Sequence, residues 1–291
     1  MEILRKLMEA TLCPIETPKA YGLYHILFMV ISIALMLTFC ILMRKKNDKV
    51  FRIVMLVTGG LLIGAELYKH FYYALAYDKY YINDLGQKIF YNTDGGYEWD
   101  IFSFQLCSVP MYLAIAVGCM KKGKLRDTIC EYMVSIGFLG GIMAYVEPSG
   151  ILHNDLFCLL HSSIWYSLLI FMALYILFTK NACLRLRDYP RALIVFGGVI
   201  IVATILNVAF YSKADEGFNM CYISPFRDSP LIIVKDVTPI IRQYLGDILG
   251  RVVAGALYSV AVAAGGFVVY LANYYVIKLV NLISSKIKKA N

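Results

Sequence analysis

The sequence predicts an all-α, polytopic membrane protein with about seven transmembrane helices and an interfacial helix at the N-terminus. Of its 291 residues, 60% are hydrophobic and only 16% are charged, and the mean hydropathy is +0.65. Soluble domains carry about 25% charged residues. The apolar runs are long enough to cross a hydrocarbon core of about 30 Å, which requires about 20 residues per helix. Little chain remains for a soluble domain, so residues 1–291 are predicted to form one transmembrane helical domain.

The predicted spans alternate with polar connections. They cover residues 22–43, 51–77, 99–119, 128–147, 156–179, 192–211 and 252–277, which together form the predicted bundle 22–277. Before them, apolar residues at helical spacing predict an interfacial helix within residues 1–20, and residues 278–291 form a basic tail. Residues 212–251 contain an apolar stretch too short to cross the bilayer, so this segment either re-enters the membrane or lies flat.

Basic residues mark one side of the predicted bundle. They gather in the connections after the first, third and fifth spans: Arg44, Lys45, Lys46, Lys49 and Arg52; Lys121, Lys122, Lys124 and Arg126; and Lys180, Arg185, Arg187 and Arg191. Because positively charged loops stay on the cytoplasmic side, these connections and the C-terminal tail are predicted to be cytoplasmic and the N-terminus outside. The expected location is the cell membrane. The net charge of +8 comes in short clusters of this kind, so no nucleic-acid partner is expected.

The cysteines do not suggest a disulfide framework or a metal centre. Most of the eight lie in or beside apolar segments, and the sequence has no CxxC pair and no Cys/His spacing typical of metal ligands. No phosphate loop or dinucleotide fingerprint is present. We therefore expect no metal and no other cofactor, and we expect most cysteines to be buried small side chains.

Polar side chains interrupt several spans, and each is a candidate site residue because an ionisable group at membrane depth costs a few kcal/mol on insertion scales. Glu66, Lys69 and His70 share one face of the second span, where a local Glu–Lys pair is the simpler interpretation. The others are Gln105 and Cys107 in the third span, His161 and Trp165 in the fifth, Asn207 in the sixth and Asn219 just after it. Pro110 is expected to loosen the third helix beside Cys107, because proline cannot donate to the carbonyl of residue 106.

These side chains are predicted to lie in one layer of the membrane. At a rise of 1.5 Å per residue, Cys107 lies about 12 Å and His161 about 8 Å below the outer ends of their helices, and Glu66 lies about 16 Å below the outer end of its own. We therefore expect one polar cavity that opens outward. Within it an imidazole could take the proton of a thiol, which makes Cys107 the candidate nucleophile and His161 the candidate base.

The sequence around these residues resembles a known family. Residues 105–113 (Gln-Leu-Cys-Ser-Val-Pro-Met-Tyr-Leu), preceded by Glu66 and Trp99, resemble the bacterial YwaF-like integral membrane proteins, which belong with the eukaryotic transmembrane-protein-164 acyltransferases. Residues 161–165, Asn207 and residues 219–223 are similar to later motifs of the same family. The resemblance implies a seven-helix acyltransferase in which a cysteine carries a transient acyl thioester, a histidine acts as base and membrane lipids are the substrates.

Carried onto this chain, the resemblance makes Cys107 the acyl-accepting nucleophile and His161 the general base. It implies that Glu66, Gln105 and Asn207 orient the histidine or polarise the ester carbonyl, and that Trp99 shapes the mouth. The full set of candidate substrate-binding residues is Glu66, Lys69, His70, Trp99, Gln105, Trp165, Asn207 and Asn219. Other interpretations stay open: a lipase-like hydrolase of lipid esters, a non-enzymatic transporter or binding protein that uses Glu66, Lys69 and His70, or a structural partner without a site.

Overall fold

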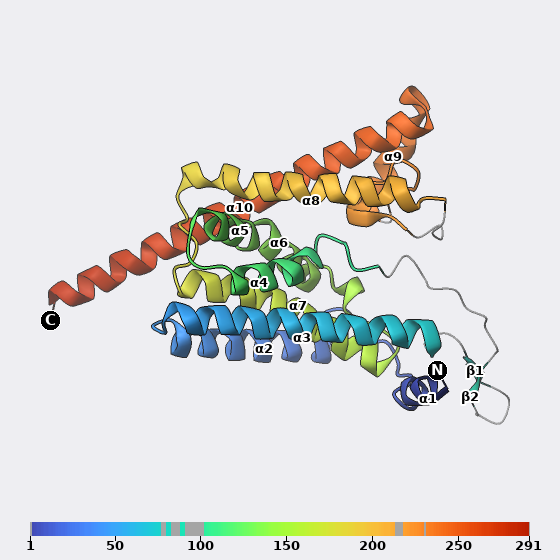
Figure 1. The fold of residues 1–291 in the computed structure, drawn as a ribbon, viewed down its shortest axis with the longest axis horizontal. Coiled ribbons are helices and arrows are strands. Elements are labelled where there is room, and N and C mark those ends of the chain that lie inside the picture. The colour runs from blue at the N-terminus through green and yellow to red at the C-terminus, as the bar shows by residue number, and fades with distance from the viewer. Residues whose placement is uncertain are drawn as a thin grey trace.

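Long apolar helices dominate the structure, a computed structural model that describes residues 2–76, 80–82, 88–90, 102–212, 218–229 and 231–290. Most of the long helices lie side by side along one direction, and the last one crosses them obliquely (Figure 1). The long helices are α2 (Leu23–Met43), α3 (Asp48–Leu75), α5 (Lys124–Met133) with α6 (Ile136–Val146), α7 (Leu156–Phe178), α8 (Tyr189–Phe210) and α10 (Asp247–Ala290). These six segments are long and apolar enough to cross a membrane, which confirms the all-α polytopic fold.

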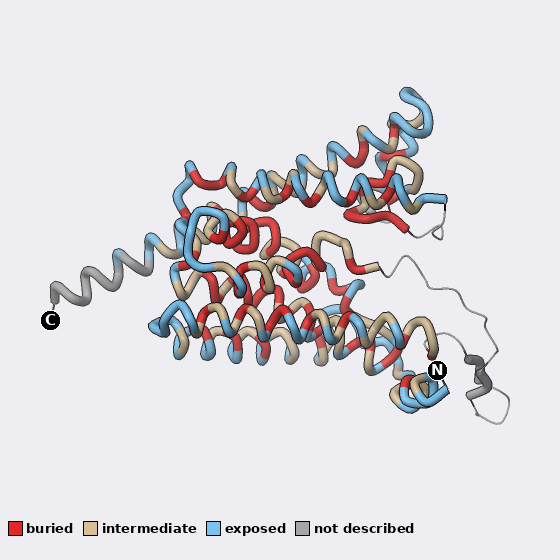
Figure 2. The backbone as a smooth tube through the Cα atoms, in the orientation of Figure 1, coloured by how far each residue is buried: buried red, intermediate tan, exposed pale blue. Residues whose placement is uncertain are grey.

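The outer faces of the bundle carry apolar side chains where a soluble protein would carry polar ones. Figure 2 shows exposed residues along the outer helices and buried residues between them. Leu35 of α2, Ile194 of α8 and Val260 of α10 are each about two-thirds or more exposed, at 66%, 71% and 67%. Rows of this kind would be unfavourable in water, and they fit contact with lipid chains.

The third predicted span differs from the prediction. A helix was expected over 99–119, but within its described part only α4 (Val109–Cys119) is helical, and residues 102–108 form an irregular segment. Eleven helical residues span about 16 Å, which is half of a hydrocarbon core. Pro110 does not kink a helix here. It lies in the first turn of α4, where its missing N–H would have no intrahelical partner anyway.

The fourth span is broken between α5 and α6. The helix stops at Met133 and resumes at Ile136, with Ser135 in a non-helical conformation (φ −119°, ψ −89°). The Asn273 side chain of α10 donates to the carbonyl of Val134 at 2.8 Å, and the Ser135 hydroxyl donates to the carbonyl of Glu131 at 2.6 Å. A break in the backbone at membrane depth is stable only when its polar groups find such partners.

Shorter elements lie at one end of the bundle. The N-terminal helix α1 (Glu2–Ala10) buries Met8 against a cluster that includes Tyr72 of α3 and Cys158 of α7. A two-stranded antiparallel hairpin pairs β1 (Tyr80–Ile82) with β2 (Lys88–Phe90) in the register Tyr80 with Phe90. One turn of 3₁₀ helix, η2 (Pro148–Gly150), follows α6, and another, η4 (Met220–Tyr222), follows α8.

The segment between the last two predicted spans contains a short helix, α9 (Ile232–Leu245), that packs against the start of α10. Gly246 joins the two helices at φ +77°, a conformation that favours glycine. As a result α10 begins at Asp247 rather than at residue 252, and it continues as one helix through the predicted basic tail to Ala290. The C-terminus and the connections after α2, α4 and α7 lie at the end of the bundle opposite α1 (Figure 1).

Candidate functional site

A polar cavity of about 220 Å³ lies in the half of the bundle nearest α1. It is enclosed by α3, the irregular segment 102–108, α7, the connection before α7 and η4. The lining residues are Glu66, Lys69, Tyr73, Phe102, Ser103, Gln105, Cys107, Ser108, Gly150, His153, His161, Ser162, Trp165, Tyr166 and Tyr222. Six of the predicted site residues therefore share one cavity: Cys107, His161, Glu66, Lys69, Gln105 and Trp165.

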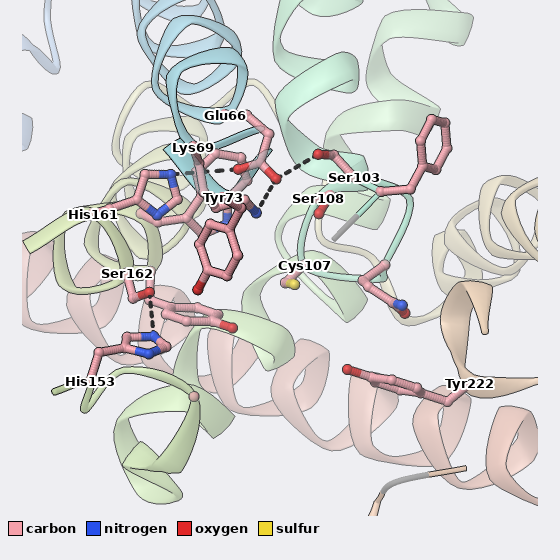
Figure 3. Close-up of a pocket in the computed structure, with 15 residues that line it drawn as sticks. Glu66, Lys69, Tyr73, Ser103, Cys107, Ser108, His153, His161, Ser162 and Tyr222 are labelled. Atoms are coloured by element: carbon pink, nitrogen blue, oxygen red, sulfur yellow. Dashed lines mark hydrogen bonds and ion pairs between the residues drawn. The ribbon is translucent and has the colours of Figure 1, made fainter. Parts of the chain in front are cut away.

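The carboxylate of Glu66 is the centre of a hydrogen-bond network in this wall (Figure 3). The residue is 4% exposed, and its Oε1 atom accepts from Lys69, one turn along α3, and from the Ser103 hydroxyl at 2.5 Å. Because Ser103 gives its proton to Glu66, its oxygen is free to accept from His70 Nε2 at 2.8 Å. The predicted local Glu–Lys pair exists, and it also connects α3 to the irregular segment.

His161 faces the other oxygen of the same carboxylate. Its Nε2 atom lies 3.5 Å from Glu66 Oε2, a distance of ion-pair range that is too long for a good hydrogen bond. The imidazole stacks on the ring of Trp165, with 5.5 Å between centroids and 22° between planes. Phe157 packs on it from the preceding turn of α7. A carboxylate beside a packed imidazole orients the ring and stabilises its protonated form, which is the arrangement that a general base requires.

Cys107 lies two residues before α4, among the lining side chains of the cavity (Figure 3). Its thiol contacts the hydroxyl groups of Tyr166 and Ser108. Within the described part of the chain, no hydrogen bond joins this thiol to His161. The first backbone N–H groups beside Cys107 are used within the chain, because those of Ser108 and Val109 both donate to the carbonyl of Gln105, at 2.8 and 3.2 Å.

The irregular segment is held by contacts from distant parts of the chain. The Tyr112 hydroxyl donates to the carbonyl of Ser103 at 2.9 Å, and the Cys221 thiol donates to the carbonyl of Phe104 at 3.4 Å. The Gln105 amide donates to the carbonyl of Asn219 at 2.9 Å, while its own Oε1 is buried without a partner among the described residues. Non-helical backbone at membrane depth is tolerated where it is buried in protein or lines a cavity, and here it does both.

Sequence reasoning missed several lining residues, above all His153 and Tyr166. His153 lies in the connection between α6 and α7, and its Nε2 atom is 3.0 Å from the Ser162 hydroxyl. Burial lowers the pKa of His153 below its ordinary value, which favours the neutral imidazole near pH 7. A histidine in a connection carries no depth signal, and a tyrosine in an apolar helix looks like core, so neither stands out from the sequence.

Asn207 and Asn219 lie outside the cavity lining and hold the backbone of η4. Asn207 is fully buried; its amide nitrogen donates to the carbonyl of Met220 at 3.0 Å, and its oxygen accepts from the N–H of Met220 at 2.7 Å. Asn219 accepts from the N–H of Ser224 at 2.8 Å. Within η4, Cys221 and Tyr222 adopt positive φ angles of 51° and 59°, which side chains disfavour and which neighbouring contacts must maintain. The two asparagines thus position Tyr222 at the cavity.

Replacing Asn207 by leucine is expected to lower stability as well as activity. The change leaves two buried backbone groups of Met220 without partners, at a cost of about 1–3 kcal/mol. A thermal unfolding midpoint of the purified protein measures it, with Thr204→Val, an exposed position one turn earlier on α8, as the neutral control. If Asn207→Leu instead raises only the KM and leaves the midpoint unchanged, Asn207 contacts substrate, as the sequence analysis predicted.

The two remaining predicted site residues are His70 and Trp99. His70 is not part of the lining but reaches the Glu66 network through Ser103. Trp99 lies outside the residues that the structure describes, so its predicted place at the mouth stays a prediction.

Fold and site together define a polytopic α-helical membrane protein with a Cys, His and Glu cavity inside the bundle. The model of the TMEM164 family matches residues 20–245, and the chain therefore belongs to the TMEM164 family. This confirms the predicted relationship to the transmembrane-protein-164 proteins, and it does not support the narrower assignment to the bacterial YwaF-like proteins. No curated protein and no solved structure matches the chain.

Proposed function

We propose that this protein is a membrane-embedded, thiol-dependent acyltransferase that acts on the acyl chains of lipids. One observation carries the proposal: Cys107 and His161 line the same polar cavity, and His161 lies beside the buried carboxylate of Glu66. A thiol, an imidazole and a carboxylate on three separate chain segments are the groups that nucleophilic acyl transfer requires. Membership of the TMEM164 family agrees with this assignment at the level of the fold.

The reaction has two balanced steps. In the first, His161 takes the thiol proton, the Cys107 sulfur attacks the ester carbonyl of a donor lipid, and the bond from carbon to the leaving oxygen breaks as the imidazolium returns the proton to that oxygen. In the second, His161 takes the proton of an acceptor hydroxyl, whose oxygen attacks the thioester. The sulfur leaves, and it regains a proton from the imidazolium.

Proton transfer between Cys107 and His161 must pass through water or through the substrate, because the two side chains do not form a hydrogen bond in the described structure. The cavity has room for this. Its 220 Å³ corresponds to the volume of about seven water molecules, at about 30 Å³ each. Catalytic hydrogen bonds are often long in the absence of substrate and shorten when it binds.

The substrate class follows from the position of the cavity. It is smaller than the 300–1,000 Å³ of typical small-molecule pockets, so it would hold the ester group of a lipid while the acyl chain remains among hydrocarbon. The site lies at the end of the bundle opposite the basic connections. If those connections face the cytoplasm, the N-terminus lies outside, the C-terminus inside, and the cavity opens to the outer leaflet of the cell membrane.

A hydrolase of lipid esters is the nearest alternative, since water in the cavity could replace the acceptor hydroxyl. A transporter or binding protein that relies on Glu66, Lys69 and His70 is favoured by a different observation, the ion pair between Glu66 and Lys69. The first alternative predicts free fatty acid as the product, and the second predicts that Cys107 is dispensable.

The decisive experiment is covalent labelling of Cys107. Purified protein incubated with a phospholipid mixture that carries isotopically labelled acyl chains should acquire a label that hydroxylamine removes and that peptide mapping places on Cys107. The variant Cys107→Ala should lose the label, whereas Cys119→Ala, an exposed cysteine at the far end of α4, should keep it. Equal labelling of Cys107→Ala and the unchanged protein would refute the thioester mechanism.

A further inference from the structure

A second group of chemically reactive side chains lies at the end of the bundle opposite the cavity. Glu131 of α5 meets Cys183 and Asp188, which lie in the connection between α7 and α8. One potential ligand atom from each residue lies within 4.8 Å of the other two. Asp188 is the last residue of a short 3₁₀ helix, η3 (Leu186–Asp188), which leads directly into α8.

The carboxylate of Glu131 is buried and only half satisfied. The residue is fully buried, at 0% exposure. Its Oε1 atom accepts from the backbone N–H groups of Cys183 at 2.7 Å and Leu184 at 3.2 Å. Its Oε2 atom has no hydrogen-bond partner in the described part of the chain. The hydroxyl of Tyr270 also interacts with the Glu131 carboxyl group, but the hydrogen bond that it donates with good geometry goes to the carbonyl of Arg185 at 2.9 Å.

The backbone of the connection is shaped around this carboxylate. Leu184 adopts a positive φ of 43°, an unfavourable angle for a branched side chain, and this conformation accompanies the two hydrogen bonds to Glu131. A purely structural role for Glu131 explains the engaged oxygen. It does not explain the free oxygen, nor the thiol and the second carboxylate beside it.

The negative charges of the cluster are compensated only in part. Asp188 is 5% exposed, and its only ion pair within the described residues is with Arg191 at 3.3 Å, whose side chain is 41% exposed. Over the same residues, Glu131 forms no ion pair with a lysine or arginine. The described residues thus place one partly exposed arginine beside two buried carboxylates, and a bound cation would balance the remaining negative charge.

We propose that Glu131, Cys183 and Asp188 form a binding site for a divalent cation of the zinc class. Thiolate sulfur and carboxylate oxygen are both ligands of Zn²⁺, which binds three protein ligands and a water in open sites. Binding releases the thiol proton to solvent, and the two carboxylates, the thiolate, the metal ion and Arg191 then sum to zero charge. Cys183 is exposed, which gives the ion a path from solvent. The proposal is independent of acyl transfer at Cys107.

The test measures metal binding by the purified full chain, prepared without a polyhistidine tag and treated with a chelator. Added Zn²⁺ should raise the thermal unfolding midpoint. Added Co²⁺ should produce the absorption band of thiolate-to-cobalt charge transfer. Cys183→Ser should lose the band and bind Zn²⁺ at least about tenfold more weakly. Cys119→Ser, which replaces an exposed cysteine at the end of α4, should retain both responses.

The variant Glu131→Gln distinguishes a metal-binding Glu131 from a Glu131 that is simply protonated. If Glu131 is merely protonated, glutamine replaces it without loss of stability and the unchanged protein shows no response to Zn²⁺ or Co²⁺, which would overturn the proposal. A cobalt band that persists in Cys183→Ser would overturn it as well. Since Cys183 is at the surface, its substitution tests the site even if Glu131→Gln does not fold.

Discussion

His161→Gln is expected to slow acyl transfer by about 10²–10⁴-fold, the usual contribution of a general base. Glutamine fills similar space and keeps a polar group toward Glu66, but it cannot accept a proton from the Cys107 thiol. Formation of the labelled thioester in a single turnover isolates this step from the later transfer to an acceptor. The unfolding midpoint should change little, because Lys69 and Ser103 continue to hold the Glu66 carboxylate.

The second histidine of the cavity provides the matched control. His153→Gln makes the same substitution in the connection before α7, where the imidazole bonds Ser162 and is not paired with Glu66. Its effect on thioester formation should be smaller by at least about tenfold, since His153 forms no ion pair with a carboxylate among the described residues, whereas His161 lies 3.5 Å from Glu66. If His153→Gln abolishes thioester formation and His161→Gln does not, the base has been assigned to the wrong imidazole.

Most of the fold was predictable because apolar runs of membrane-spanning length are a strong signal. The second, fifth and sixth predicted spans correspond to α3, α7 and α8 within a few residues. The third span failed for a physical reason. Residues 102–108 continue into the apolar run of α4, but their backbone carbonyls accept hydrogen bonds from side chains of α4 and η4. The amino-acid sequence alone does not show these tertiary partners.

The candidate site was predictable only in part. The free-energy cost of placing an ionisable group at membrane depth identifies Glu66, Lys69 and His161 as candidates. These three side chains do lie together in one wall of the cavity. Asn207 was predicted to contact substrate on the same grounds, but its amide forms hydrogen bonds with the backbone of Met220. Depth along a helix says nothing about the direction in which a side chain points, so it groups positioning residues with lining residues.

Arg126 has a structural role that the sequence did not indicate. The sequence suggested that the basic connections set the orientation of the chain, but Arg126 also forms hydrogen bonds inside the protein. Its side chain is fully buried. It donates to Asp48 at 2.7 Å, to the Asn181 side chain at 2.9 Å and to the carbonyl of Met120 at 3.4 Å. The guanidinium of Arg126 therefore joins the connections before α3, before α5 and after α7 by hydrogen bonds.

Arg126→Met should lower the free energy of unfolding by about 2–4 kcal/mol, a range that rests on the cost of breaking buried, charged hydrogen bonds. A loss of about 5 kcal/mol, the upper end for a broken buried ion pair, is not expected. Asp48 is 45% exposed, so water can take the place of the Arg126 guanidinium beside it. Methionine replaces the aliphatic part of the side chain but not the guanidinium, so the Asn181 oxygen loses its Arg126 donor. Unfolding followed by tryptophan fluorescence or calorimetry in one detergent measures the change.

Arg187→Met is the control for Arg126→Met, since Arg187 is an exposed arginine of the same basic end. Its effect should stay within about 0.5 kcal/mol, as for surface substitutions in general. Equal loss of stability in both variants would mean that charge at this end, rather than the buried contacts of Arg126, stabilises the protein. A selective loss in Arg126→Met would show that part of the positive charge that orients the chain also holds the connections together.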